Sequence, residues 1–162
     1  MIPEVESLVQ QLTHAQERLH RALEGISEVE LRKSAAKDEW SVAEIIGHIV
    51  EFQPFWMGKV PLMTSEDNPY AGRTSEEEEQ RLEVVAIAKE APLPELQRLL
   101  QAANEKTLGL VRQLQLSQLS RPGQWSEGRI YTVREMIEQI IIEHLLGHAK
   151  QIQETRDRFK VG

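Results

Sequence analysis

Three histidines are the residues of this sequence whose types and spacing best suit chemistry. His144 and His148 lie four positions apart in a segment with a helical pattern, so their rings share one helix face, one turn apart. Such a pair can chelate a metal ion, and the alternative is two partly exposed rings bonded to water or to carboxylates. His48 lies between Ile45 and Ile49 in a second helical segment, where a single histidine is more often a hydrogen-bonded core residue. Three histidines on inward helix faces together favour a metal site.

The type of ligand narrows the choice of metal. Three neutral imidazoles suit zinc, nickel, iron or copper, and they suit magnesium or calcium poorly. A site with three protein ligands keeps a position open for water or substrate, which is typical of a reactive centre. We therefore expect one divalent transition-metal ion (zinc, nickel or iron) and a small-molecule substrate. The other two histidines, His14 and His20, are six positions apart and do not share a helix face, so we interpret them as surface or rim residues.

Three further polar residues lie close in sequence to the histidines. Glu44 precedes His48 by one turn and is a candidate to orient its ring, although a role at the helix start also explains it. Glu51 follows His48 by about one turn and is a candidate general base or supporting carboxylate. Gln151 extends the face of the histidine pair and is a candidate to support the site or to hold a bound water. For each of the three, a position on the surface or rim is the alternative.

Aromatic residues and glycines near the histidines have two interpretations each. Phe55 and Trp56 either wall a substrate pocket or belong to the core, and Tyr70 lies in a long connection that could cover the metal as a lid. Gly47 and Gly147 directly precede His48 and His148. Because glycine costs about 1 kcal/mol within a helix, either close helix packing requires these two glycines or they are simply tolerated.

The elements that must position these residues are helices. Four long segments repeat apolar residues at three- and four-residue steps, the pattern of amphipathic helices, and no convincing strand pattern is present. Two helices begin with a capping box, formed by Ser41 with Glu44 and by Thr132 with Glu135. The sequence therefore predicts an all-α four-helix bundle. Its helices are expected from Pro3 to Gly25, from Ser41 to about Val60, from about Leu93 to Leu116, and from Thr132 towards Phe159.

The connection between the second and third helices, about residues 61–92, is unusually long. Turn-forming residues mark a loop in its first part, and a short helix is expected after them, with Thr74 or Ser75 as its cap. A connection of this length can return along the bundle, so the two helices that it joins need not be antiparallel. The loop is marked by Pro61, Asn68, Pro69 and Gly72.

Composition excludes several classes of protein. The 162 residues are 40% hydrophobic and 28% charged, which fits one globular domain over residues 1–162. The net charge of -7, without a basic cluster, argues against nucleic acid and anionic membranes as partners. The sequence contains no cysteine, so disulfides and thiolate ligands are excluded. Neither a signal peptide nor an apolar run of about 20 residues is visible, and we expect a cytoplasmic protein.

Three motifs occur in an order that is typical of a known family. They are Trp40-Ser-Val-Ala-Glu44-Ile-Ile-Gly-His48, Thr132-Val-Arg-Glu135 and His144-Leu-Leu-Gly-His148-Ala-Lys-Gln-Ile152. In these motifs and in its helix pattern, over nearly the whole chain, the sequence resembles the DinB/YfiT-like superfamily. The resemblance implies a four-helix bundle with an up-down-down-up course, and it implies His48, His144 and His148 as the metal ligands.

The resemblance also implies a range of functions. The family includes transferases that join low-molecular-weight thiols, such as bacillithiol or mycothiol, to electrophiles, and it includes a mycothiol-dependent isomerase. Other members are known only as metal-dependent hydrolases or stress-induced proteins. We therefore expect a thiol S-transferase, with a hydrolase or a non-catalytic, metal-binding stress-response bundle as alternatives. Because the chain has no cysteine, any thiol must come from a small-molecule cosubstrate. A homodimer is also expected.

Overall fold

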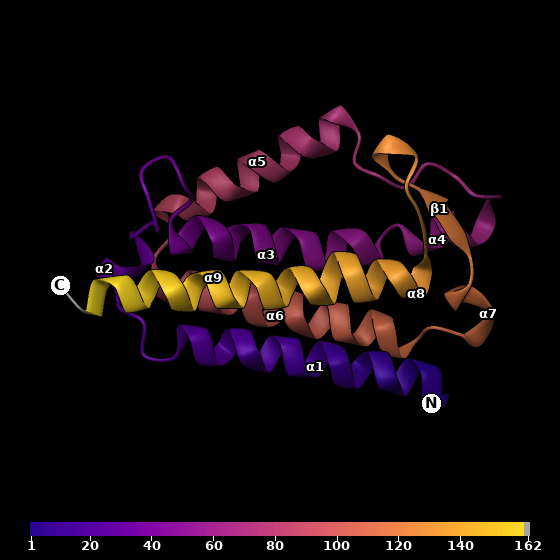
Figure 1. The fold of residues 1–162 in the computed structure, drawn as a ribbon, viewed down its shortest axis with the longest axis horizontal. Coiled ribbons are helices and arrows are strands. Elements are labelled where there is room, and N and C mark those ends of the chain that lie inside the picture. Colours follow the sequence, from indigo (N-terminus) through magenta and orange to yellow (C-terminus); the bar gives the residue numbers. More distant parts are fainter. Residues whose placement is uncertain (161–162) are drawn as a thin grey trace.

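Four long helices build the protein, as the computed structural model of residues 1–160 shows (Figure 1). The last of them continues from a helical turn, α8 (Val133–Glu135), through a π-helical segment, η2 (Met136–Ile142). The all-α class predicted from the sequence is confirmed. The four long helices are α1 (Pro3–Leu23), α3 (Val42–Met57), α6 (Leu93–Arg112) and α9 (Glu143–Lys160).

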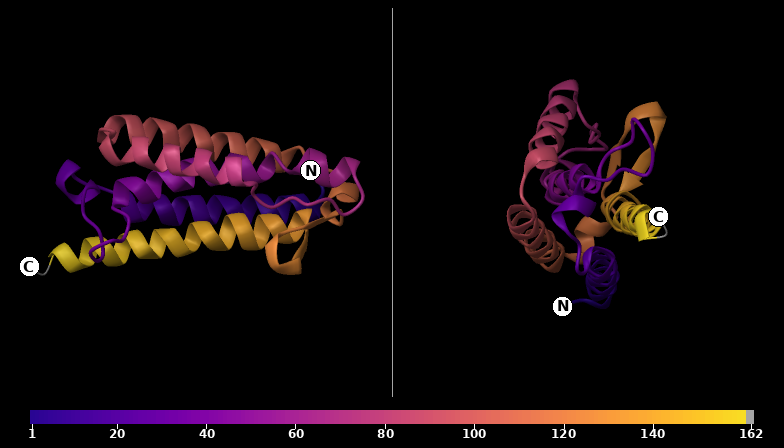
Figure 2. Two further views of the ribbon diagram at one scale, coloured as in Figure 1. Left: turned by 90° about the horizontal axis from the view of Figure 1, so that it is seen from above. Right: turned by 90° about the vertical axis from the view of Figure 1, so that its left-hand side faces the viewer.

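The course of the bundle is up-down-down-up. In Figure 1, α1 and α9 run in one direction, whereas α3 and α6 both run in the other. The parallel pair is possible because a further helix, α5 (Ser75–Glu90), runs back along the outside of α3 before α6 begins (Figure 2). The course expected from the family resemblance is therefore confirmed.

The core is formed by the apolar stripes of the four helices. In α1 the stripe is spaced by three and four residues, and its members are fully buried, from Val5 to Leu19. In the last helix Ile137, Ile141 and Leu145 continue the same core. Burying such a side chain stabilises the fold by roughly 1.5–3 kcal/mol. None of the helices that the structure describes is both long and apolar enough to cross a membrane.

The connection between α3 and α6 differs in detail from its prediction. The helix α3 ends at Met57, and Pro61, expected in a loop, lies in the first turn of the separate helix α4 (Val60–Ser65). The expected short helix is α5, and it has 16 residues. Its cap is Thr74, one of the two predicted candidates. The length was missed because α5 buries only a narrow face, which gives a weak apolar periodicity.

Short elements fill the two ends of the bundle. The expectation that the chain contains no strand was wrong, because β1 (Pro122–Gln124) and β2 (Ile130–Thr132) form a small antiparallel hairpin around the turn η1 (Ser126–Gly128). Three residues are too few to show the alternation that marks a strand in a sequence. Two single-turn helices, α2 (Glu28–Leu31) and α7 (Leu116–Leu119), complete the fold.

Candidate metal centre

The fold brings His48, His144 and His148 together from two helices. One ligand nitrogen from each ring lies within 4.8 Å of the other two. The ring centre of His48 is 5.2 Å from that of His144 and 5.1 Å from that of His148. The rings of His144 and His148 have centres 4.6 Å apart. The arrangement suits three imidazoles that share one small cation.

Local sequence fixes where each helix presents its histidine. At the start of α3, Ser41 and Glu44 form the predicted capping box, which sets the first turn that leads to His48. In the last helix the amide of Glu143 donates to the carbonyl of Glu138, five residues back, and the π-helical segment ends at Ile142, two positions before His144. Such π segments occur often at functional sites.

The π-helical segment also changes the face on which the histidines lie. From the sequence, His144 and His148 continue a stripe with Ile137 and Ile140, as if all four faced the core. In the structure the core stripe passes through Ile137 and Ile141, whereas Ile140 lies beside the histidines at the wall of a cavity. The histidines are therefore next to the core and open to a cavity, as a binding site requires.

Two nitrogen atoms of the cluster lack hydrogen-bond partners. Within residues 1–160, buried His48 Nδ1 and His148 Nε2 make no hydrogen bond, and we call them the open nitrogens. His48 itself is 5% exposed. A buried polar atom without a partner costs roughly 1–3 kcal/mol, which a ligand that accepts its lone pair would offset. Neutral imidazole nitrogen in this state is a good ligand for zinc, nickel or iron, so the cluster fits a divalent transition metal.

The histidines are held in the form that binds metal. Burial, followed by the neighbouring His148 and His144, lowers the pKa of His48 from 6.5 to about 2. Burial and then His148 lower the pKa of His144 to about 4, although a backbone hydrogen bond at Ile140 opposes the shift. Burial also lowers the pKa of His148. All three rings are therefore neutral at pH 7, the state that a metal ligand needs.

Gln151 supports the cluster through His148. Its side-chain Oε1 lies 2.9 Å from His148 Nδ1, so the ring carries its proton there and leaves Nε2 as the open nitrogen. Bonds of this kind fix the tautomer and orientation of a metal-binding histidine. The contact agrees with the supporting role expected for Gln151, and it involves the ring directly.

The two glutamates expected beside His48 have other partners. Glu44 accepts from the Ser41 backbone amide at 3.0 Å, which is the capping role given above as its alternative, and no hydrogen bond among the described residues joins it to His48. Glu51 pairs with the guanidinium of Arg73, with Oε2 3.0 Å from Nη1 and a second bond from Nη2 to Oε1. Glu51 is therefore not a free general base, because a carboxylate in such a forked pair is already occupied.

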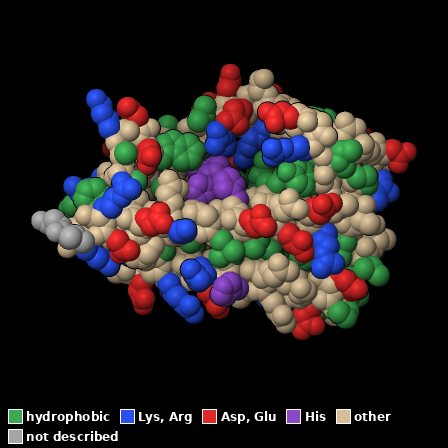
Figure 3. All heavy atoms as spheres, in the orientation of Figure 1, with side chains coloured by type: hydrophobic (Ala, Val, Ile, Leu, Met, Phe, Trp, Pro, Cys, Tyr) green, Lys and Arg blue, Asp and Glu red, His purple; other side chains and the backbone are tan. Residues whose placement is uncertain are grey.

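The histidines lie at one side of a cavity of about 380 Å³. Figure 3 shows histidine side chains near the centre of one face of the protein, with basic side chains directly beside them. Sequence reasoning missed the two arginines of this cavity. Only the folded chain brings Arg81, on α5, and Arg73, in the connection before α5, to the histidines. Besides the histidines, the cavity is lined by Trp40, Trp56, Arg73, Glu78, Arg81 and Ile140.

The aromatic candidates divide between the cavity and its surroundings. Trp56 lines the histidine cavity, and Phe55 lies beneath the guanidinium of Arg73, 3.9 Å from its central carbon. Tyr70 is 51% exposed and donates its hydroxyl to the carbonyl of Arg73 at 3.3 Å. It lines a neighbouring cavity and does not cover the histidines, so the lid expected at Tyr70 is not formed.

The structure explains the glycine before His48 differently from the glycine before His148. A Cβ atom at Gly47 would lie 2.3 Å from the Cβ atom of Ala88, so glycine is required for the close contact between α3 and α5. Around Gly147 an added Cβ would meet no atom of the described chain within 4 Å, so this glycine is only tolerated. The close contact at Gly47 matters for the site because α5 carries Arg81.

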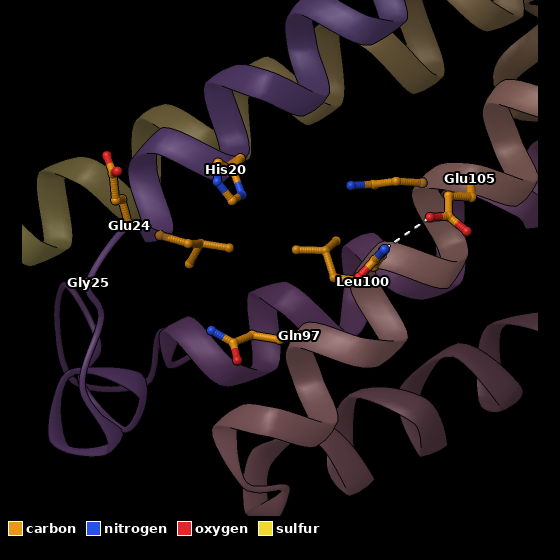
Figure 4. A pocket seen from close by; sticks show the side chains of 9 residues that line it. His20, Glu24, Gly25, Gln97, Leu100 and Glu105 are labelled. Atoms are coloured by element: carbon orange, nitrogen blue, oxygen red, sulfur yellow. Dashed lines mark hydrogen bonds between the residues drawn. The ribbon is translucent and has the colours of Figure 1, made fainter.

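A larger cavity lies elsewhere, between the end of α1 and the face of α6. It has a volume of about 660 Å³, and His20 on α1 faces Gln97 and Leu100 on α6 across it (Figure 4). His20 is exposed and stands apart from the histidine cluster. Size alone therefore does not locate the site, and the chemistry of the side chains favours the smaller cavity at the three histidines.

Comparison with known proteins agrees with this fold. Residues 11–152 match the DinB superfamily, and the protein belongs to that family. A protein of Halalkalibacterium halodurans named "putative metal-dependent hydrolase" is 27% identical over 157 residues, which cover 97% of this chain and 89% of that protein.

Two solved structures have the same architecture. YfiT from Bacillus subtilis, described as a probable metal-dependent hydrolase with an unusual four-helix bundle topology, superposes with a TM-score of 0.78 at 20% identity, and the match covers 99% of this chain and 90% of that one. The mycothiol-dependent maleylpyruvate isomerase superposes with a TM-score of 0.75 at 16% identity. That match covers 93% of this chain and 61% of the isomerase. These likenesses establish the shared bundle.

Proposed function

We propose that the protein is a metal-dependent enzyme in which His48, His144 and His148 hold one divalent transition-metal ion, either zinc, nickel or iron. The observation that carries the proposal is the cluster of three neutral imidazoles, with its two open nitrogens, at the side of an open cavity. The names of the Halalkalibacterium halodurans and Bacillus subtilis relatives support metal dependence. Three protein ligands leave room for a substrate atom, as in catalytic rather than structural sites.

The reaction that we favour is transfer of a small-molecule thiol to an electrophile. A divalent ion in the site would lower the pKa of a bound thiol or water. A bound thiol, whose ordinary pKa is near 8.5, ionises more readily under such conditions than bound water, whose ordinary pKa is near 15.7. Among the described residues, Glu78 is the one carboxylate lining the cavity, and it pairs with Arg81. The cavity therefore suits a thiol better than a nucleophile that needs a general base.

Hydrolysis is the second candidate. Both the Halalkalibacterium halodurans and Bacillus subtilis relatives carry the word hydrolase in their names or descriptions. In that reaction Glu78 would have to leave Arg81 to accept a proton from water. The third reading, a metal-binding bundle without catalysis, predicts metal binding and no turnover.

Metal analysis tests the ligand set. The protein should be purified without a nickel column and its metal content measured by mass spectrometry. We expect one transition-metal ion per chain in the wild type and less than a tenth of that in His48→Ala, His144→Ala and His148→Ala. The exposed histidine variant His20→Ala serves as the matched control and should keep its metal. A wild type that takes up no transition metal would exclude the proposed site.

An activity screen separates the three functions. Metal-loaded protein is assayed for conjugation of a panel of thiols to small electrophiles and for hydrolysis of amides and esters, with His148→Ala as the inactive reference. Conjugation lost in the variant supports thiol transfer, and hydrolysis lost in the variant supports the second candidate. Equal rates for wild type and variant in every assay would leave only the non-catalytic bundle.

A further inference from the structure

Two arginines stand at the histidine cavity on aromatic supports. The central carbon of the Arg73 guanidinium is 3.9 Å from the ring centre of Phe55, and that of Arg81 is 5.6 Å from the ring centre of Trp40. Their side chains are only 11% and 20% exposed. A guanidinium stacked on a ring keeps a fixed orientation and can present its N–H groups to a ligand.

Each arginine keeps donors beyond those used in its ion pair. A guanidinium has five N–H donors. Arg73 uses Nη1 and Nη2 for Glu51, and Arg81 uses Nη2 for Glu78. The Nε of Arg81 is buried and has no acceptor within the part of the chain that the structure describes. The side chain of Glu78 is 45% exposed, so it can turn towards solvent when another acceptor replaces it.

The charges around the histidines do not balance a bound metal ion. Each arginine has one carboxylate partner, Glu51 for Arg73 and Glu78 for Arg81, so each pair is neutral as a whole. Histidines bind a metal ion in their neutral form, so they add no charge. A divalent ion would thus bring two positive charges to a cavity whose own groups offset none of them, although the whole chain carries a net charge of -7. The ligand that completes the site must supply negative charge.

We infer that the thiol cosubstrate of the proposed enzyme carries a carboxylate, and that Arg73 and Arg81 bind this carboxylate beside the histidine cluster. The inference rests on the proposed function. A thiolate and a carboxylate together supply two negative charges, which match those of a divalent ion. Bonds from guanidinium to carboxylate are charge-assisted and directional, so they also orient the thiol.

The neighbouring cavity gives room for the rest of such a molecule. Its volume is about 550 Å³, and it shares Trp56, Arg73 and Glu78 with the histidine cavity. Trp125 and Tyr70 line its far part. Since Arg73 stands where the two cavities meet, a carboxylate held there would place the thiol towards the histidines and leave space for further groups in the second cavity.

The test compares two probes that differ only at the end opposite the thiol. Zinc-loaded protein is titrated with 3-mercaptopropionate and with neutral 3-mercapto-1-propanol by calorimetry. We expect the acid to bind roughly 10- to 100-fold more tightly, as for one charge-assisted pair. In Arg81→Gln this preference should fall about tenfold. Arg98→Gln, an exposed arginine paired with Glu95 on α6, is the matched control and should keep the preference.

Arg73 is tested by the milder change Arg73→Lys. This variant keeps a positive charge beside Glu51 but loses the two parallel N–H donors of the guanidinium. Thermal unfolding checks that the variant is folded. A reduced preference for the acid is expected here as well. If wild-type protein binds both probes equally, or if Arg81→Gln and Arg73→Lys both keep the wild-type preference, the inference is overturned while the metal proposal stands.

A second experiment, without metal, separates failure of the carboxylate site from failure of the metal proposal. Metal-free protein is titrated with glutarate, which has carboxylates but no thiol, and the arginine Nε–Hε signals are followed by NMR. A saturable shift of the Arg81 signal, with the Arg98 signal unchanged, supports the carboxylate subsite even if no metal is ever bound. An unchanged Arg81 signal up to high millimolar glutarate overturns it.

Discussion

Two buried polar side chains of α3, His48 and Gln53, have opposite surroundings. Gln53 is fully buried, and the protein satisfies both ends of its amide: Oε1 accepts from Gln16 at 3.2 Å and Nε2 donates to Asn104 Oδ1 at 2.8 Å. His48 is almost as buried, yet its Nδ1 is one of the open nitrogens. The first side chain is complete within the chain, whereas the second is not.

The difference separates a structural polar residue from a functional one. A satisfied buried network ties helices together, here α1, α3 and α6 through Gln16, Gln53 and Asn104. An unsatisfied buried atom costs stability, and a fold keeps it where a ligand completes it. Removing each side chain should therefore have opposite consequences, and the following changes test that contrast.

Loss of His48 should abolish metal binding. We expect His48→Leu to weaken affinity for zinc by about 100-fold or more, since changes to groups that only support a ligand already cost 10- to 100-fold. Competition with a chromophoric chelator measures the dissociation constant for zinc. Gln53→Leu, while folded, should bind zinc as the wild type does. Wild-type affinity in His48→Leu would remove His48 from the ligand set and break the contrast.

The same two variants should differ in stability when metal is absent. Gln53→Leu removes the donor to Asn104 Oδ1 and one of the two acceptors of Gln16, and it should lower the free energy of unfolding by about 2 kcal/mol. His48→Leu removes an open nitrogen and should leave the metal-free protein equally or more stable, because apolar replacement of an unpaired group is not penalised. Urea unfolding in the presence of a chelator measures both values. Equal destabilisation by the two changes would contradict our interpretation of His48.

Gln151 gives a further test of this contrast, because it is the hydrogen-bond partner of one ring nitrogen of the cluster, His148 Nδ1. Gln151→Ala frees the ring of His148 to turn, and we expect about a tenfold loss of zinc affinity with little change in the unfolding of the metal-free protein. The matched control is Gln153→Ala, whose amide donates to Asp157 at 2.9 Å on the same helix, and which should bind zinc normally. The chelator competition assay serves for both, and an unchanged affinity in Gln151→Ala would show that the hydrogen bond to His148 is dispensable.

The dependence of stability on pH gives the smallest effect. The folded-state pKa of His48 is lowered to about 2 from 6.5, so the unfolded chain takes up its proton first as pH falls. The stabilisation is complete above the unfolded pKa near 6.5 and is lost progressively below it. Between pH 6.5 and 5.5, metal-free wild type should lose about 1 kcal/mol more unfolding free energy than His48→Leu. Parallel urea midpoints of the two proteins across this range would count against a buried neutral His48.

Much of this fold could be predicted because its signals are local. The capping boxes at Ser41 and Thr132 and the apolar stripe of α1 depend on neighbouring residues, and each occurs where it was expected. The length of α5 and the β1–β2 hairpin could not be predicted. The helix α5 buries too narrow a face to show a helical period of apolar residues. The hairpin is held by backbone pairing between two strands of three residues each.

The candidate site divides in the same way. The residue types and spacing of His48, His144 and His148 indicated a metal cluster, and the fold brings these rings together. The ion pair of Glu51 could not be predicted, because its partner, Arg73, lies 22 positions away and reaches it only in the folded chain. The capping role of Glu44 could be predicted, since its partner, Ser41, lies only three positions away.

The sequence by itself determined the helices, their starts and the three imidazoles, because helical period and capping act over a few residues. The tertiary structure alone decided which arginines meet those imidazoles, which nitrogens stay open, and that Gly47 is required where Gly147 is not. Those properties depend on how closely α5 packs against α3 and on the shift of the helix face that the π-helical segment causes. Contacts between residues distant in the sequence produce no periodic pattern from which they could be predicted.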